Sequence, residues 1–96
     1  SFYSEKIFQL VEQLFSWEIK IAVCSNSTRK TLNLVLEKLK IQNFLSSTLS
    51  SSDVEKPKPS PEIYLKAMAL LNLKVSETLI IEDSAPGITA AKLSGA

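Results

Sequence analysis

Two short apolar runs constrain the fold of this chain most, because each leads into a polar loop and then into a segment of helical periodicity. They are residues 19–24 (IKIAVC) and 78–81 (TLII). Short β-branched runs bounded by turn residues predict buried strands. Alternation of strands and helices predicts an α/β fold with parallel strands joined by right-handed crossovers. In such folds ligands bind beyond the carboxyl ends of the strands.

The remaining elements follow from hydrophobic spacing and turn residues. Apolar residues at helical spacing predict four helices: about Tyr3–Phe15, around residues 32–39, around residues 63–71, and from Ile88 to Leu93 with Gly95 as C-cap. A weaker strand is predicted over Phe44–Leu49, with polar loops over Ser50–Pro61 and Glu82–Gly87. We interpret the serines between Ser46 and Ser52 as surface polarity on a loop and a strand edge.

Composition narrows the range of functions. The 96 residues carry a formal net charge of +1, which predicts neither a nucleic-acid partner nor an anionic membrane surface. The apolar runs are too short to span a bilayer. A single cysteine excludes an internal disulfide and fits a reducing, cytoplasmic setting. The absence of histidine removes the commonest general base and the commonest zinc ligand.

Glu82 and Asp83 are adjacent carboxylates directly after an apolar strand. Mg²⁺ would relieve their mutual repulsion, because it prefers carboxylate and water oxygens with a substrate phosphate completing its shell. The competing interpretation is an exposed acidic turn at the start of the next helix.

Two further polar clusters, around Lys58 and around Ser25, are predicted at the same edge of the sheet. Lys58 lies between two prolines, so its backbone is stiff and its ammonium group suits a phosphoryl oxygen. Ser25 ends the first strand, and its hydroxyl with the following N–H groups, including that of Asn26, forms an anion site at a helix N-terminus. A solvated lysine and a helix-capping serine are the alternatives.

Three strings in this order resemble the haloacid dehalogenase-like hydrolases, specifically their phosphatase and β-phosphoglucomutase-like branch. They are residues 20–27 (KIAVCSNS), 58–64 (KPSPEIY) and 80–88 (IIEDSAPGI), and the resemblance runs from about residue 18 to the end. It implies phosphate binding by Ser25, a catalytic lysine at Lys58 and metal ligation by Glu82 and Asp83. Lys56 also precedes a proline, but only Lys58 lies at the right distance from the Pro-Glu-Ile-Tyr helix start.

The chain departs from the family pattern at one decisive point, because it has no Asp-x-Asp-Gly-Thr string. In the family this first motif supplies the phosphoryl-accepting nucleophile and the acid/base. We therefore expect residues 1–96 to be the C-terminal portion of the core domain, a partial Rossmann-like sheet without the first-motif strand and the cap. Residues 1–16 would be the return helix from that cap.

The function implied by the resemblance is that of a Mg²⁺-dependent phosphatase or phosphomutase. It would act on a small phosphorylated metabolite through an aspartyl-phosphate. The alternative is a catalytically inactive phosphate- and metal-binding remnant or structural fragment.

The missing strand is central in the family's sheet, between the strands that end at Cys24 and Ile81. We expect one of three outcomes: the strand lies outside this chain, the two strands close up, or two chains associate through their edges.

Cys24 and Arg29 are similar to the Cys-x5-Arg loop of tyrosine phosphatases, but only four residues separate them. Cys24 also ends an apolar run. We interpret it as a small buried hydrophobic residue rather than a nucleophile.

Overall fold

The computed structural model describes all 96 residues and confirms the α/β class. Its helices are α1 (Phe2–Ser16), α2 (Arg29–Leu39), α3 (Glu62–Leu71) and α4 (Ala85–Ser94). Its strands are β1 (Ala22–Cys24) and β2 (Ser47–Leu49), and its short 3-10 helices are η1 (Gln42–Phe44), η2 (Ser51–Asp53) and η3 (Val75–Glu77). None of the helices is both long enough and apolar enough to cross a membrane.

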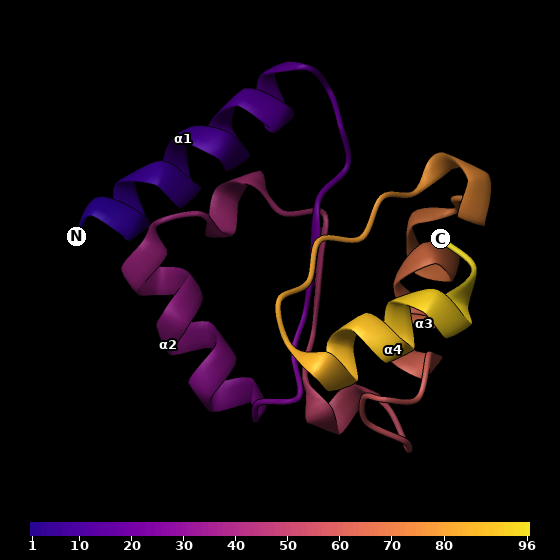
Figure 1. Ribbon diagram of the computed structural model, residues 1–96. Coiled ribbons are helices and arrows are strands. Elements are labelled where there is room, and N and C mark those ends of the chain that lie inside the picture. The colour runs from indigo at the N-terminus through magenta and orange to yellow at the C-terminus, as the bar shows by residue number, and fades with distance from the viewer.

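The two strands form a parallel pair between two layers of helices (Figure 1). Val23 lies opposite Thr48 in the register of this pair. Successive residues of a strand face opposite sides of the sheet. Accordingly, Ile21 and Val23 pack against the core of α1 and α2, whereas Ala22 and Cys24 pack against the core of α3 and α4.

Each helix layer has its own small hydrophobic core. The α1/α2 layer buries Val11, Leu32, Leu36 and Ile41. The α3/α4 layer buries Leu49, Ile63, Tyr64, Ala67, Met68 and Ala90. The strand pair is therefore the shared wall of two cores, and its carboxyl ends open toward the loops that precede α2, α3 and α4.

Helix boundaries differ slightly from the sequence prediction, for reasons of capping. Thr28, rather than Ser25 or Ser27, is the N-cap of α2, and its hydroxyl accepts a hydrogen bond from the Thr31 N–H. The loop predicted over residues 82–87 is shorter than expected. Ser84 caps α4, and Pro86 lies in the first turn, where its missing N–H is of no consequence.

The strand predicted over Thr78–Ile81 is wrong. This segment links η3 to α4 without pairing to any strand, and Leu79, Ile80 and Ile81 make no backbone hydrogen bonds. Strands are stabilised by a neighbouring ladder, and no strand of this chain pairs with this segment. Of the three expected outcomes, closing up against β1 is also wrong, because no backbone hydrogen bond joins the two segments.

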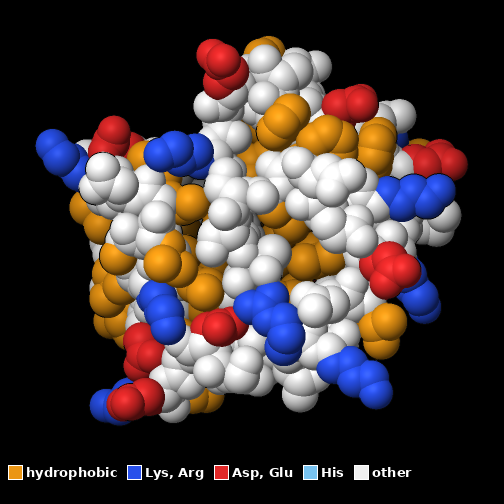
Figure 2. All heavy atoms as spheres, turned by 180° about the vertical axis from the view of Figure 1, so that it is seen from behind, with side chains coloured by type: hydrophobic (Ala, Val, Ile, Leu, Met, Phe, Trp, Pro, Cys, Tyr) orange, Lys and Arg blue, Asp and Glu red, His pale blue; other side chains and the backbone are white.

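The unpaired segment leaves large apolar side chains in solvent. Leu79 is 85% exposed and Ile81 is 77% exposed, whereas Ile80 between them packs against the α3/α4 core. Elsewhere α1 exposes Phe2, Tyr3 and Leu10, and Trp17 just after it is 64% exposed. Seen from behind, hydrophobic side chains reach the surface along one side and near the middle of the view (Figure 2). Such surface favours association.

We expect the isolated chain to self-associate through this edge, which sedimentation velocity over a concentration series can measure. Replacing Leu79 and Ile81 together by serine should reduce association, because both side chains flank unpaired backbone. The matched control is Leu65→Ser with Leu70→Ser, which removes exposed leucines from α3. Equal effects of the two double variants, or a wild-type chain that stays monomeric, would contradict edge association.

Candidate active site

Three polar loops meet at the carboxyl ends of the strands. The first follows β1 at Ser25–Thr28, the second precedes α3 around Lys58, and the third joins residue 81 to α4 at Glu82–Ser84. The amide of Asn26 pairs with the Lys58 backbone in both directions. The Lys58 N–H donates to Asn26 Oδ1 at 3.0 Å, and Asn26 Nδ2 donates to the Lys58 carbonyl at 3.3 Å.

The Lys58 side chain connects the second loop to the other two. Its ammonium donates to Glu82 Oε2 at 2.7 Å and to the carbonyl of Cys24 at 2.9 Å. The Lys58 side chain is only 9% exposed and that of Glu82 13% exposed. An ammonium has three N–H donors, so one remains without an acceptor in the protein. Lys58 is thus a fixed cation with one donor left for a ligand.

Glu82 is held by donors on both carboxylate oxygens. Oε2 accepts from Lys58 and, at 2.6 Å, from the Tyr64 hydroxyl. Oε1 accepts from the Asp83 N–H, the Ser84 N–H and the Ser84 hydroxyl at 3.0–3.2 Å. Burial alone would raise the pKa of Glu82, but hydrogen bonds from Lys58, Tyr64 and the Ser84 backbone outweigh it. The pKa of Glu82 therefore lies well below its ordinary value, and the carboxylate stays ionised.

Gly87 makes room for this carboxylate at the start of α4. A Cβ atom on Gly87 would overlap the Glu82 side chain at its Cδ, Oε2 and Cγ atoms. The Glu82 carboxylate cannot simply swing aside, since five hydrogen bonds hold it. Gly87 is buried, so the glycine at this position serves close packing rather than a turn.

Asp83 differs from Glu82 in its exposure and in its contacts. It is exposed, and its carboxylate makes no hydrogen bond or ion pair. The donor chemistry of Glu82 and Asp83 suits a hard cation such as Mg²⁺. However, no group of three or more acidic, cysteine or histidine side chains that could hold a metal exists in the chain. Asp83 is therefore the one carboxylate of this pair that no group of the protein engages.

Ser25 directly follows β1, at the carboxyl end of that strand. Its N–H donates to the Leu49 carbonyl at 2.9 Å, and this extends the strand ladder by one bond. Its hydroxyl oxygen accepts from the Ser27 N–H at 3.0 Å. The hydroxyl proton has no acceptor in the protein, so Ser25 retains a donor for an anion.

An ion pair that sequence reasoning missed ties the first loop to the end of β2. The Arg29 guanidinium lies 2.6 Å from Asp53 and also donates to the Thr48 hydroxyl and carbonyl at 2.6 and 2.8 Å. Asp53 accepts in turn from Ser50, both backbone and side chain. Hydrogen bonds from the Ser50 backbone and from Arg29 lower the pKa of Asp53.

Ser50 corrects the interpretation of the serine-rich stretch as surface polarity, because it is fully buried. The hydrophobic periodicity of the sequence gave no sign that Ser50 is buried. Only the spacing of Ser50 and Asp53, which form a reciprocal capping box, could have shown it.

Comparison with known proteins identifies the family. The haloacid dehalogenase-like hydrolase family model matches residues 2–96. This chain belongs to that family.

Two curated relatives and one solved structure are similar over most of this haloacid dehalogenase-like chain. A haloacid dehalogenase-like hydrolase domain-containing protein of Arabidopsis thaliana is 36% identical over 93% of the chain and 29% of its own length. Pyrophosphatase PpaX of Anoxybacillus flavithermus is 33% identical over 95% of the chain and 42% of its own length. A Thermotoga maritima structure assigned as a β-phosphoglucomutase has a TM-score of 0.84 at 29% identity, covering 88% of this chain and 39% of that one. The chain thus spans less than half the length of each.

The Lys56 side chain and the Cys24 thiol take no comparable part in this haloacid dehalogenase-like site. Lys56 is exposed, and only its backbone N–H is bonded, to Glu62. Burial raises the pKa of the Cys24 thiol to about 11, so it is protonated at neutral pH. Arg29, which would have to assist it in a tyrosine-phosphatase loop, is engaged with Asp53 instead.

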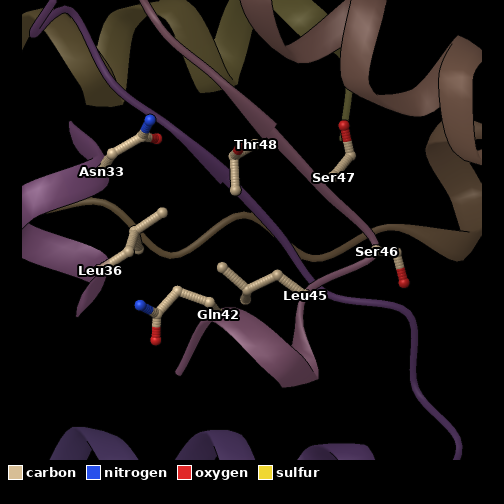
Figure 3. A pocket seen from close by; sticks show the side chains of 7 residues that line it. All are labelled: Asn33, Leu36, Gln42, Leu45, Ser46, Ser47 and Thr48. Carbon is tan, nitrogen blue, oxygen red and sulfur yellow. The ribbon is translucent and has the colours of Figure 1, made fainter. Parts of the chain in front are cut away.

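A shallow hollow of about 320 Å³ lies elsewhere on the domain, between α2, η1 and β2 (Figure 3). It is lined by Asn33, Leu36, Gln42, Leu45, Ser46, Ser47 and Thr48. None of these carries an acidic or basic group, and none belongs to the three loops. The hollow therefore offers no charged side chain to a phosphate group or a metal ion.

The Glu82 carboxylate should make the stability of the chain depend on pH. Because its pKa is depressed in the folded state, its contribution is complete above the ordinary value of 4.5 and is lost as the pH falls below it. We expect the free energy of unfolding in urea to decline between about pH 5 and pH 3, and to decline less steeply in Glu82→Gln. Glu12→Gln, an exposed glutamate on α1, is the control and should follow wild type.

Proposed function

We propose that the protein containing this chain is a Mg²⁺-dependent phosphatase or phosphomutase of the haloacid dehalogenase-like family. Its substrate would be a small phosphorylated metabolite. Support comes from the family match and from relatives named as a pyrophosphatase and assigned as a β-phosphoglucomutase. The single cysteine is a free thiol, which suits an enzyme of the reducing cytoplasm.

The observation that carries this proposal is the fixed ammonium of Lys58 with its one free N–H donor. The Cys24 carbonyl and Glu82 hold the ammonium in place before any ligand binds. A preorganised donor stabilises charge that develops on a transferring phosphoryl group without reorganising during the reaction. Ser25, with its unused hydroxyl proton, and Asn26, which holds the Lys58 backbone, would complete the phosphate-binding edge.

Asp83, with Glu82 beside it, would hold Mg²⁺, whose charge would be shared with the phosphoryl oxygens. The two carboxylates are too few for an octahedral ion, so substrate phosphate, water and residues outside this chain would complete the shell. Within this chain Glu82 and Asp83 would have different roles. Glu82 aligns Lys58 and the loop through its hydrogen bonds, whereas Asp83 presents an unpaired carboxylate.

The nucleophile would be an aspartate of the family's first motif, which forms an aspartyl-phosphate in covalent catalysis by a carboxylate. Neither of the two aspartates of this chain has that setting, since Asp53 is paired with Arg29 and Asp83 follows the last motif's glutamate. Residues 1–96 on their own would therefore bind phosphate at most. In that form the chain matches the alternative of an inactive phosphate- and metal-binding fragment.

Lys58→Ala in the full-length protein should cost about 2–4 kcal/mol of transition-state stabilisation, measured as kcat/KM with a generic aryl phosphate. Lys56→Ala, in the same loop and also before a proline, is the control and should leave kcat/KM unchanged. The melting midpoint is measured alongside, because Lys58 also pairs with Glu82. Sensitivity at Lys56 instead of Lys58 would refute the assignment, as would turnover by residues 1–96 alone.

Asp83→Asn in the full-length protein should raise the Mg²⁺ concentration for half-maximal activity by roughly 10- to 100-fold and lower turnover by orders of magnitude. The lost charge leaves the ion poorly held beside the phosphate. Glu55→Gln removes an exposed carboxylate from the loop before α3 and serves as control. An unchanged Mg²⁺ dependence in Asp83→Asn would place the metal elsewhere.

A further inference from the structure

Tyr64 contacts both members of the Lys58–Glu82 ion pair. Its hydroxyl donates to Glu82 Oε2 at 2.6 Å, and the Lys58 ammonium lies 5.1 Å from the centroid of its ring. The second distance is within the range of a cation–π interaction. No other side chain in the structure makes contact of this kind with both groups.

The placement of Tyr64 follows from the periodicity of α3. Tyr64 belongs to the buried face of that helix with Ile63, Ala67 and Met68, and it is 7% exposed. Its ring fills part of the α3/α4 core, where phenylalanine would pack equally well. The hydroxyl is therefore the part of the side chain that packing does not explain. A buried tyrosine hydroxyl needs a polar partner, and here that partner is a carboxylate of the site.

The two oxygens of Glu82 are held from different directions. The donors to Oε1 come from Glu82's own loop, at Asp83 and Ser84, whereas those to Oε2 come from Lys58 and from Tyr64 on α3. Burial, followed by the hydrogen bond and charge of Glu82, raises the pKa of Tyr64, so the hydroxyl remains a donor. The Tyr64 hydroxyl thus limits rotation of the carboxylate against which the lysine is aligned.

We propose that Tyr64 is a positioning residue for phosphoryl transfer, which it serves by orienting Glu82 through its hydroxyl and Lys58 through its ring. This inference rests on the proposed function. It assigns a role in the reaction to a residue of α3, a helix whose sequence pattern indicates core packing. Removal of such an outer partner commonly costs 10- to 100-fold in activity.

The test is Tyr64→Phe in the full-length protein, with Tyr3→Phe as the matched control because Tyr3 is 78% exposed and makes no polar side-chain contact. Tyr64→Phe should lower kcat roughly 10- to 100-fold on a generic aryl phosphate, with little change in KM. Tyr3→Phe should match wild type. A kcat within twofold of wild type in folded Tyr64→Phe would overturn the proposal.

A structural readout separates this proposal from the proposed function. In ¹H–¹⁵N spectra Tyr64→Phe should move the amide signals of Asp83 and Ser84, which donate to Glu82, and Tyr3→Phe should not. Glu82→Gln, which keeps the tyrosine, should move the ring resonances of Tyr64 but not those of Tyr3. If wild type shows no turnover but these signals move, the positioning contact stands and the proposed function fails. If Glu82→Gln leaves the Tyr64 resonances unmoved, the contact is absent and the proposal fails, even should Tyr64→Phe not fold.

Discussion

The Lys58–Glu82 ion pair is the interaction on which the rest of the site depends. Both side chains are largely removed from water, and charges in that position are costly unless every lone pair and proton finds a partner. The chain meets this demand almost completely, with five donors to Glu82 and two acceptors for Lys58. The one donor left over is the third N–H of the Lys58 ammonium. One unused donor in a network that is otherwise fully hydrogen-bonded is expected of a ligand-binding group rather than of a purely structural ion pair.

The same pair explains how the third loop is placed without a sheet. Leu79, Ile80 and Ile81 make no backbone hydrogen bonds, so no ladder fixes the register of Glu82. Its position comes instead from side chains. Ile80 packs on the α3/α4 core, the Glu82 carboxylate bonds to Lys58 and Tyr64, and Gly87 admits that carboxylate beside α4. The site is therefore assembled by packing and ion pairing across α3 and α4, with β1 supplying a carbonyl.

Sequence reasoning located these loops because it relied on features that are local. Apolar runs precede Ser25 and Glu82, Lys58 lies just before a helix start, and the topology then brings such strand ends and helix starts to one edge. It failed where the outcome depends on a distant partner. The run at 78–81 has every local mark of a strand, but a strand needs a neighbour, and residues 1–96 contain none for it.

The roles of Ser50 and Tyr64 were missed because nothing in their local sequence is unusual. Their local patterns, a polar loop and a core helix face, are ordinary, and their roles come from Asp53 and Glu82.

Structural and chemical roles are consequently combined in the same few residues, which affects how any substitution in this chain must be interpreted. Removing one partner of a buried ion pair costs about 3–5 kcal/mol, because the other charge is left uncompensated. That is comparable with the transition-state stabilisation that a single preorganised donor provides, about 2.7–4 kcal/mol. Loss of activity at Lys58 or Glu82 alone therefore cannot distinguish a catalytic group from a fold-supporting one.

Asp83 and Tyr64 are more informative positions. Asp83 makes no side-chain contact that folding would lose, and Tyr64 can surrender its hydroxyl while its ring still fills the core. Substitutions at Asp83 and Tyr64 therefore test the chemistry of the site separately from its stability.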